Sequence, residues 1–207
     1  MKIINLDTWK RREHLDFFSK FDEPMFSISA DVNCTEAYNY CKQNHISFFA
    51  YYLHKALVAV NEIHEFRCRI INDTVVEFDV INASPTIGRK DETFGFGYIP
   101  YNTDFEKFNS SLQSEKTRIQ NSSGLGFNYD NIKHDVIHFS SLPWINFTGL
   151  THPRNFNSPD SVPKISFGKV NLVDRLYIMP VSVLAHHGLM DGIHIAKYLE
   201  KFESLLG

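Results

Sequence analysis

Two adjacent histidines, His186 and His187, are followed by Asp191-Gly192 and then by His194. Near neutral pH an imidazole can take a proton on one ring nitrogen while its other nitrogen is held in place, and a carboxylate four residues further on can anchor the turn that carries it. This spacing suits an acid/base site. The same residue types also suit a zinc site made from His186 or His187 with Asp191 and His194, although no Glu follows in the spacing of a metalloprotease.

The histidine pair lies at a predicted junction between a strand and a helix. The run from Leu176 to Ala185 is almost wholly apolar, which predicts a buried strand, and apolar residues recur at helical spacing from Ile195 to Leu206. Asp191 is therefore expected at the start of that helix. Pro180 predicts either a bulge in the strand or one missing ladder hydrogen bond.

Other helices are predicted by apolar spacing and by capping residues. Asp7 or Thr8 can cap a helix that begins at Trp9. The others are predicted from Thr35 to about Gln43, from Ser47 to Ile63 and from Asp104 to Ile119. The second of these three has the broadest apolar face.

The remaining apolar or alternating runs predict strands. They cover residues 25–32, 66–71, 75–80, 86–88, 93–99, 136–142 and 164–172. Asn72-Asp73 predicts a hairpin turn, and the polar stretches 121–130 and 151–161 predict loops. Strands and helices that alternate irregularly indicate an α+β fold, a mixed β-sheet covered by helices on one face. The other face needs a cover too.

Composition limits the class of protein. The 207 residues can bury one sizeable core and contain no Pro/Gly/Ser-rich linker, so residues 1–207 are expected to form a single domain. The net charge of -3 gives no basic footprint for nucleic acid. Three cysteines without metal-type spacing, no signal peptide and no long apolar run predict a soluble cytoplasmic protein with reduced thiols and no membrane partner.

Five landmarks, in this order and spacing, resemble the chloramphenicol acetyltransferase family over nearly the whole chain. They are Trp9-Lys10-Arg11-Arg12-Glu13-His14, Glu92-Thr93-Phe94 with Pro100-Tyr101, Ser141-Leu142-Pro143-Trp144-Ile145-Asn146-Phe147, Met179-Pro180-Val181-Ser182, and His186-His187 with Asp191-Gly192 and His194. The histidine motif alone recurs in dihydrolipoyl acyltransferases and in peptide-synthetase condensation domains. Condensation domains, however, are much longer than this chain.

The resemblance implies a fold, an assembly and a reaction. The fold would be the sandwich of coenzyme A dependent acyltransferases, and the assembly a homotrimer with active sites between subunits. The reaction would be acetyl-CoA dependent O-acetylation of chloramphenicol, an antibiotic-resistance activity, with acetyl-CoA as co-substrate and no metal. His187 would be the general base and the Ser140 hydroxyl the donor to the tetrahedral oxyanion. Arg11 and Asp191 would form a buried ion pair that holds the turn.

The resemblance also places residues at the acceptor. The matching positions are Phe18, Phe26, Phe94, Leu150 and Ser166. Three charged or polar residues, Asp22, His152 and Arg154, fall where the family has apolar ones, and they would need partners or water. Two alternatives stay open: an acetyltransferase for another hydroxylated small molecule, and a non-catalytic ligand-binding protein of the same fold.

Overall fold

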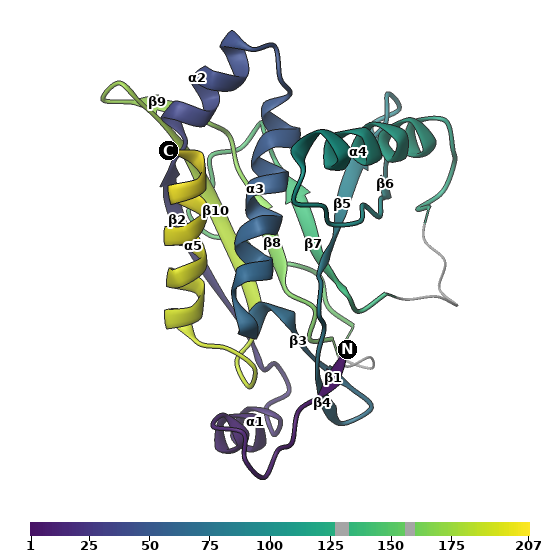
Figure 1. Ribbon diagram of the computed structural model, residues 1–207, viewed down its shortest axis with the longest axis vertical. Coiled ribbons are helices and arrows are strands. Elements are labelled where there is room, and N and C mark those ends of the chain that lie inside the picture. Colours follow the sequence, from purple (N-terminus) through teal and green to yellow (C-terminus); the bar gives the residue numbers. More distant parts are fainter. Residues whose placement is uncertain (127–132, 156–159) are drawn as a thin grey trace.

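The computed structural model describes residues 1–126, 133–155 and 160–207 (Figure 1). In the first half of the chain the elements are β1 (Lys2–Ile3), α1 (Arg12–Phe18), β2 (Met25–Asn33), α2 (Thr35–Gln43), α3 (Phe48–Glu62), η1 (His64–Arg67), β3 (Cys68–Ile71), β4 (Thr74–Glu77), β5 (Asn82–Gly88) and β6 (Phe94–Phe96). The second half contributes α4 (Phe105–Gln120), β7 (Val136–Ser141), β8 (Lys164–Phe167), β9 (Asn171–Val173), β10 (Leu176–His186) and α5 (Gly192–Leu206).

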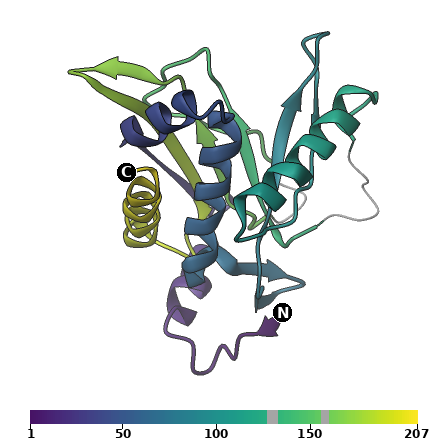
Figure 2. The same ribbon diagram turned by 45° about the horizontal axis from the view of Figure 1, so that its top comes forward.

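The main sheet is mixed, as predicted. Its strands follow the order β2-β10-β8-β7-β5-β6, and β9 pairs with β10. Strands β5, β7 and β8 run parallel, whereas β10 is antiparallel to both β2 and β8. Helices α3 and α5 lie over one face of this sheet (Figures 1 and 2). Their apolar sides pack on sheet residues such as Phe139, Phe167 and Val181 in one core, so the predicted α+β class is confirmed.

The connection from β7 to β8 covers part of the opposite face. Lys169 N donates to Ile145 O at 2.8 Å, and the Ser166 hydroxyl lies 3.2 Å from His152 Nε2. Gly168 permits a close approach, because a β-carbon there would lie 3.0 Å from Cε1 of Phe147. The connection therefore supplies a cover for the second face. Residues 127–130 and 156–159 of the two predicted loops lie outside the described residues.

A second, three-stranded sheet has the order β1-β4-β3. Its hairpin turns at Asn72 and Asp73, as predicted, and both residues have positive φ angles of 48° and 59°. Two consecutive positive φ angles are the geometry of a tight two-residue hairpin, which Asn and Asp tolerate better than most residues. In the described part of the chain, no helix is long and apolar enough to cross a membrane.

The first predicted helix begins later than expected. It starts at Arg12 rather than Trp9, and neither Asp7 nor Thr8 caps it. Trp9 instead packs on a small cluster around Leu15, and the Asp7 carboxylate forms an ion pair with Arg12. Tertiary contacts have therefore replaced the local cap that the sequence offered.

Several predicted strands also differ in extent: 66–71 is regular only from Cys68, because η1 ends at Arg67, and 75–80 is regular only over Thr74–Glu77. The predicted strand 164–172 is divided into β8 and β9: Gly168 N donates to Pro180 O, but Pro180 has no N–H to return a ladder bond, and Lys169 N donates to Ile145 O instead. The predicted strand 93–99 is regular only at β6, whereas 86–88 extends back to Asn82. Pro180 makes no bulge in β10, because the pairing with β2 continues through the Pro180–Asp31 pair. On its other side, β10 pairs with β8 only from Val181 onward.

Candidate active site

His187 is the first residue after β10, and aromatic rings hold its side chain. Its backbone N–H donates to Pro24 O at 2.8 Å. The imidazole stacks on Phe18, with centroids 4.0 Å apart and an interplanar angle of 6°. Phe26 on β2 contacts it as well, at 4.3 Å and 31°. The sequence that ends a buried strand at His186 thus places the next ring against two aromatic side chains.

The two ring nitrogens of His187 have different surroundings. Nδ1 is buried and lies 3.2 Å from Asp191 Oδ1, although it makes no well-directed hydrogen bond to the described residues. The side chain is 33% exposed; Nε2 makes no hydrogen bond to the described residues and is not one of the buried polar atoms without a partner, so this nitrogen is accessible. A carboxylate beside Nδ1 favours the tautomer with its proton there, which leaves the Nε2 lone pair free to accept a proton.

Arg11 holds both Asp191 and the backbone of His187. Its Nη1 donates to Asp191 Oδ2 at 2.5 Å and its Nη2 to Asp191 Oδ1 at 3.1 Å. Nη2 also donates to His187 O at 3.0 Å. These hydrogen bonds, opposed by burial, lower the pKa of Asp191 below its ordinary value. The expected ion pair is therefore present, and the Arg11 side chain is only 12% exposed.

His194 caps α5 with its ring. Asp191 N donates to His194 Nδ1 at 2.8 Å, so the ring proton belongs on Nε2, which lies 3.3 Å from Glu65 Oε1. Burial is the main cause that lowers the pKa of His194. The sequence indicated no role for Glu65, because its contact joins η1 to α5 only in the folded chain. Among the described residues, no group of three His, Cys, Asp or Glu side chains is placed to hold a metal ion.

Ser140 is far from His187 within one chain. The register pairs Ser140 with Ser166 and Ser166 with Ser182, so the three form one row across β7, β8 and β10. Two strand spacings and five residues along a strand separate Ser140 from His187, or about 19 Å between their Cα atoms. Both groups would have to lie within about 3 Å of one reacting centre to act together. A single chain therefore does not bring them together.

The predicted acceptor residues are also spread over the sheet. Phe94 on β6, 44% exposed, lies at the edge opposite β2. Ser166 is buried beside His152, and Leu150 is half-buried in the β7–β8 connection. Within one chain, Phe18 and Phe26 contact His187, and Phe94 lies several strands away.

Of the three charged or polar residues that stand where the family has apolar ones on the predicted acceptor wall, two have partners. Arg154 forms an ion pair with Glu23, and His152 faces the Ser166 hydroxyl. These two side chains therefore find within the chain the polar partners that a buried polar group requires. Asp22 is exposed and lines a cavity described below.

The chain has the fold of coenzyme A dependent acyltransferases. A solved structure described as a chloramphenicol acetyltransferase superposes with a TM-score of 0.93 and 30% identity, covering 100% of this chain and 99% of that one. A probable dihydrolipoamide acetyltransferase from Listeria monocytogenes, at 14% identity and a TM-score of 0.68, shares the fold alone.

The family itself follows from the sequence comparisons. The family model described as chloramphenicol acetyltransferase matches residues 1–203, so the chain belongs to this family and is an acyltransferase. The chloramphenicol acetyltransferase of Bacillus pumilus is 25% identical over 97% of this chain and 91% of its own length. That of Staphylococcus aureus is 27% identical over 98% of this chain and 94% of its own length.

Proposed function

We propose that this protein transfers the acetyl group of acetyl-CoA to a hydroxyl of chloramphenicol, with His187 as the general base. The observation that carries the proposal is the pair of environments of the His187 ring, with Nδ1 buried beside a carboxylate and the Nε2 edge exposed. Its family membership supports the choice of acceptor. The 207 residues would act as one domain in the cytoplasm, and antibiotic resistance would be the physiological role.

The chemistry requires one base and one oxyanion donor. Nε2 of His187 would take the hydroxyl proton as the acceptor oxygen attacks the thioester carbonyl, forming a tetrahedral intermediate with a negative oxygen. The Ser140 hydroxyl would donate a hydrogen bond to that oxygen. On collapse the carbon–sulfur bond breaks, and the leaving thiolate takes the proton back from His187. The ion pair of Arg11 and Asp191 would hold the turn and exchange no proton.

The distance between Ser140 and His187 supports an active site shared by two chains. Because about 19 Å separates their Cα atoms within one chain, convergence on a single carbonyl needs His187 from one copy and Ser140 from another. We propose a homotrimer with three such sites. Trp144, which is 78% exposed, and Ile145 follow β7 closely and give this end of the strand an apolar surface suited to contact between copies.

Release of coenzyme A thiol tests the reaction. With acetyl-CoA, the protein should release thiol when chloramphenicol is added, and His187→Ala should lower the rate by about 10²- to 10⁴-fold while its circular dichroism stays unchanged. Gel filtration with light scattering should give three times the 24.0 kDa chain mass. A folded protein that releases no thiol with chloramphenicol or with a panel of other alcohols would contradict acyl transfer.

A second candidate acceptor is favoured by the polar wall. Asp22, His152 and Arg154 suit a hydroxylated molecule more polar than an aryl antibiotic, so the panel should include polyols and sugars. Tight binding of a panel member without thiol release would instead favour a non-catalytic ligand-binding protein of this fold.

A further inference from the structure

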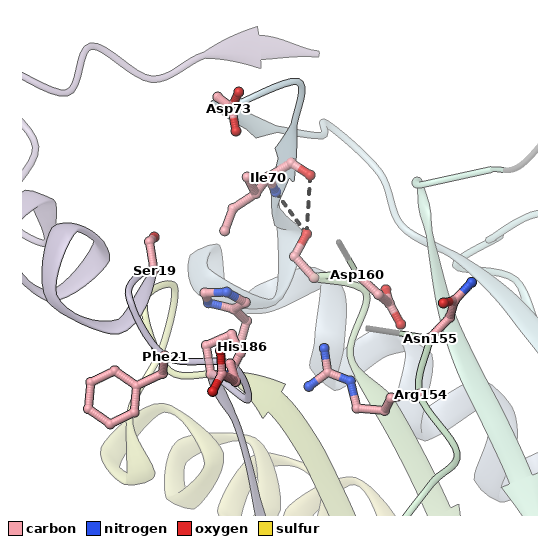
Figure 3. A pocket seen from close by; sticks show the side chains of 11 residues that line it. Ser19, Phe21, Ile70, Asp73, Arg154, Asn155, Asp160 and His186 are labelled. Atoms are coloured by element: carbon pink, nitrogen blue, oxygen red, sulfur yellow. Dashed lines mark hydrogen bonds between the residues drawn. The ribbon is translucent and has the colours of Figure 1, made fainter. Parts of the chain in front are cut away.

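A cavity of about 660 Å³ lies beside the end of α1 and the β3–β4 hairpin (Figure 3). Its lining includes Phe21, Asp22, Ile70, Arg154 and His186. The volume is within the range of small-molecule sites. Although His186 and His187 are neighbours in the chain, only His186 lines this cavity, whereas the ring of His187 packs on Phe18 and Phe26.

His186 presents an unused hydrogen-bond donor to the cavity. The residue is 6% exposed, and its Nδ1 accepts a hydrogen bond from Gly188 N at 3.1 Å. Burial lowers the pKa of His186 to about 4, so its ring is neutral at pH 7 and carries its single proton on Nε2. That N–H makes no hydrogen bond to the described residues. This nitrogen is not one of the buried polar atoms that lack a partner, so it is open to solvent or to a ligand oxygen in the cavity. The buried donor that lacks a partner in the described chain is Nε of Arg154, and such a donor is costly unless a ligand or solvent oxygen completes it.

Arg154 presents a second donor whose charge is already balanced. Its Nη1 donates to Glu23, and in the described chain its Nη2 makes no hydrogen bond. Figure 3 shows its guanidinium turned toward His186. The Asp160 carboxylate is likewise paired, with Lys164. The inner part of the cavity therefore offers N–H donors with little net charge, while the exposed carboxylate of Asp22 is an acceptor nearer solvent.

We propose that this cavity binds a neutral, hydroxyl-rich small molecule. Hydroxyl groups can accept from the Nε2–H of His186 and donate to the Asp22 carboxylate, so different hydroxyls of one molecule can serve the two ends of the site. An anion would be repelled by the exposed carboxylates of Asp22 and Asp73, and an ammonium group has no acceptor for the N–H donors of His186 and Arg154. Phe21 and Ile70 offer apolar contacts for the C–H face of a sugar-like ring.

Asp22 and Arg154 also stand on the predicted acceptor wall, so this ligand class rests on the polar acceptor of the proposed function. Saturation-transfer NMR on the 207-residue protein without acetyl-CoA tests binding separately from acyl transfer. The probes are maltose and the size-matched set glucose, gluconate and glucosamine. Maltose and glucose should receive saturation from the protein. In competition experiments, glucose should bind more tightly than gluconate and more tightly than glucosamine. No transfer to maltose or glucose, or tighter binding of gluconate or glucosamine than of glucose, would overturn the proposed ligand class.

Two matched variants connect binding to His186. His186→Asn keeps an acceptor for the Gly188 N–H but removes the donor from the cavity, whereas His186→Gln places an amide donor near the position of Nε2. Maltose should bind at least about tenfold more weakly to His186→Asn than to His186→Gln, with both variants showing wild-type circular dichroism. Should either His186 variant fail to fold, Arg154→Met removes the second donor, and maltose should bind at least about tenfold more weakly to this variant than to wild type. Equal maltose affinity in the folded variants and in wild type would refute the assignment.

Discussion

The proposed active site between subunits predicts that two inactive variants restore each other's activity. His187→Ala removes the base and should lower the rate by about 10²- to 10⁴-fold, and Ser140→Ala removes the oxyanion donor and should lower it by about 10²- to 10³-fold. Each variant alone would form trimers in which every site lacks one group. When the two chains mix, a site becomes complete wherever His187 of one chain faces Ser140 of the next.

The size of the recovery follows from the assembly. In trimers formed at random from equal amounts, half of the chains carry an intact His187 and the other half an intact Ser140. About a quarter of all sites then combine both groups, so about a quarter of the wild-type rate should return. A site built within one chain would give no recovery, because no chain in the mixture carries both groups.

Coexpression with two different affinity tags allows the measurement. Tandem purification isolates mixed trimers, in which one site of three is complete, so thiol release with acetyl-CoA and the acceptor should give about a third of the wild-type rate per site. The control pairs His187→Ala with the double variant His187→Ala/Ser140→Ala, which has no intact base and should stay inactive. If the mixed oligomers are no more active than the two parent variants, His187 and Ser140 of different chains do not act together, despite the separation of about 19 Å within one chain.

Three further predictions follow from the contacts of the turn and the core. Asp191→Ala leaves the buried Arg11 without its carboxylate, so we expect urea titration to show a loss of about 2 to 3 kcal/mol, less than for a fully buried pair because Asp191 is partly exposed. Burial lowers the pKa of both His138 and His186 to about 4, so between pH 6.5 and 4 the unfolded chain binds more protons than the folded one. The free energy of unfolding should therefore decrease as the pH is lowered from 6.5 to 4, by up to about 1.4 kcal/mol per pH unit for each histidine, and His186→Asn should reduce that slope. Glu65→Gln should lower kcat by about threefold to tenfold with KM little changed, because the Glu65 carboxylate only positions the cap of α5.

Each of these expectations has a result that would contradict it. An Asp191→Ala protein as stable as the wild type would mean that the Arg11 ion pair is solvated. A pH 4 to 6.5 stability profile with the same slope in His186→Asn would mean that this ring titrates normally in the folded chain. A Glu65→Gln enzyme with changed KM and unchanged kcat would place Glu65 at substrate rather than behind the turn.

Local sequence patterns predicted the elements that end at the site. The apolar run before His186 predicted β10, helical spacing after Asp191 predicted α5, and Asn72-Asp73 predicted the hairpin turn. These features depend on residues close together in the chain, where period, capping and turn chemistry act directly. The start of α1 and the division of 164–172 could not be predicted locally, because contacts with distant residues decide them.

The order of residues determined the mixed α+β class and the likeness to an acyltransferase family, which are carried by residue type and spacing, and that likeness led to the proposal of His187 as the base. Tertiary structure alone decided which nitrogen of that ring stays accessible, that Glu65 faces His194, and that His186 lines a cavity. It also decided that Ser140 lies five residues along the strand and two strands away from His187. The physical reason is that strand register, set by packing over the whole sheet, fixes distances between residues that no local pattern connects.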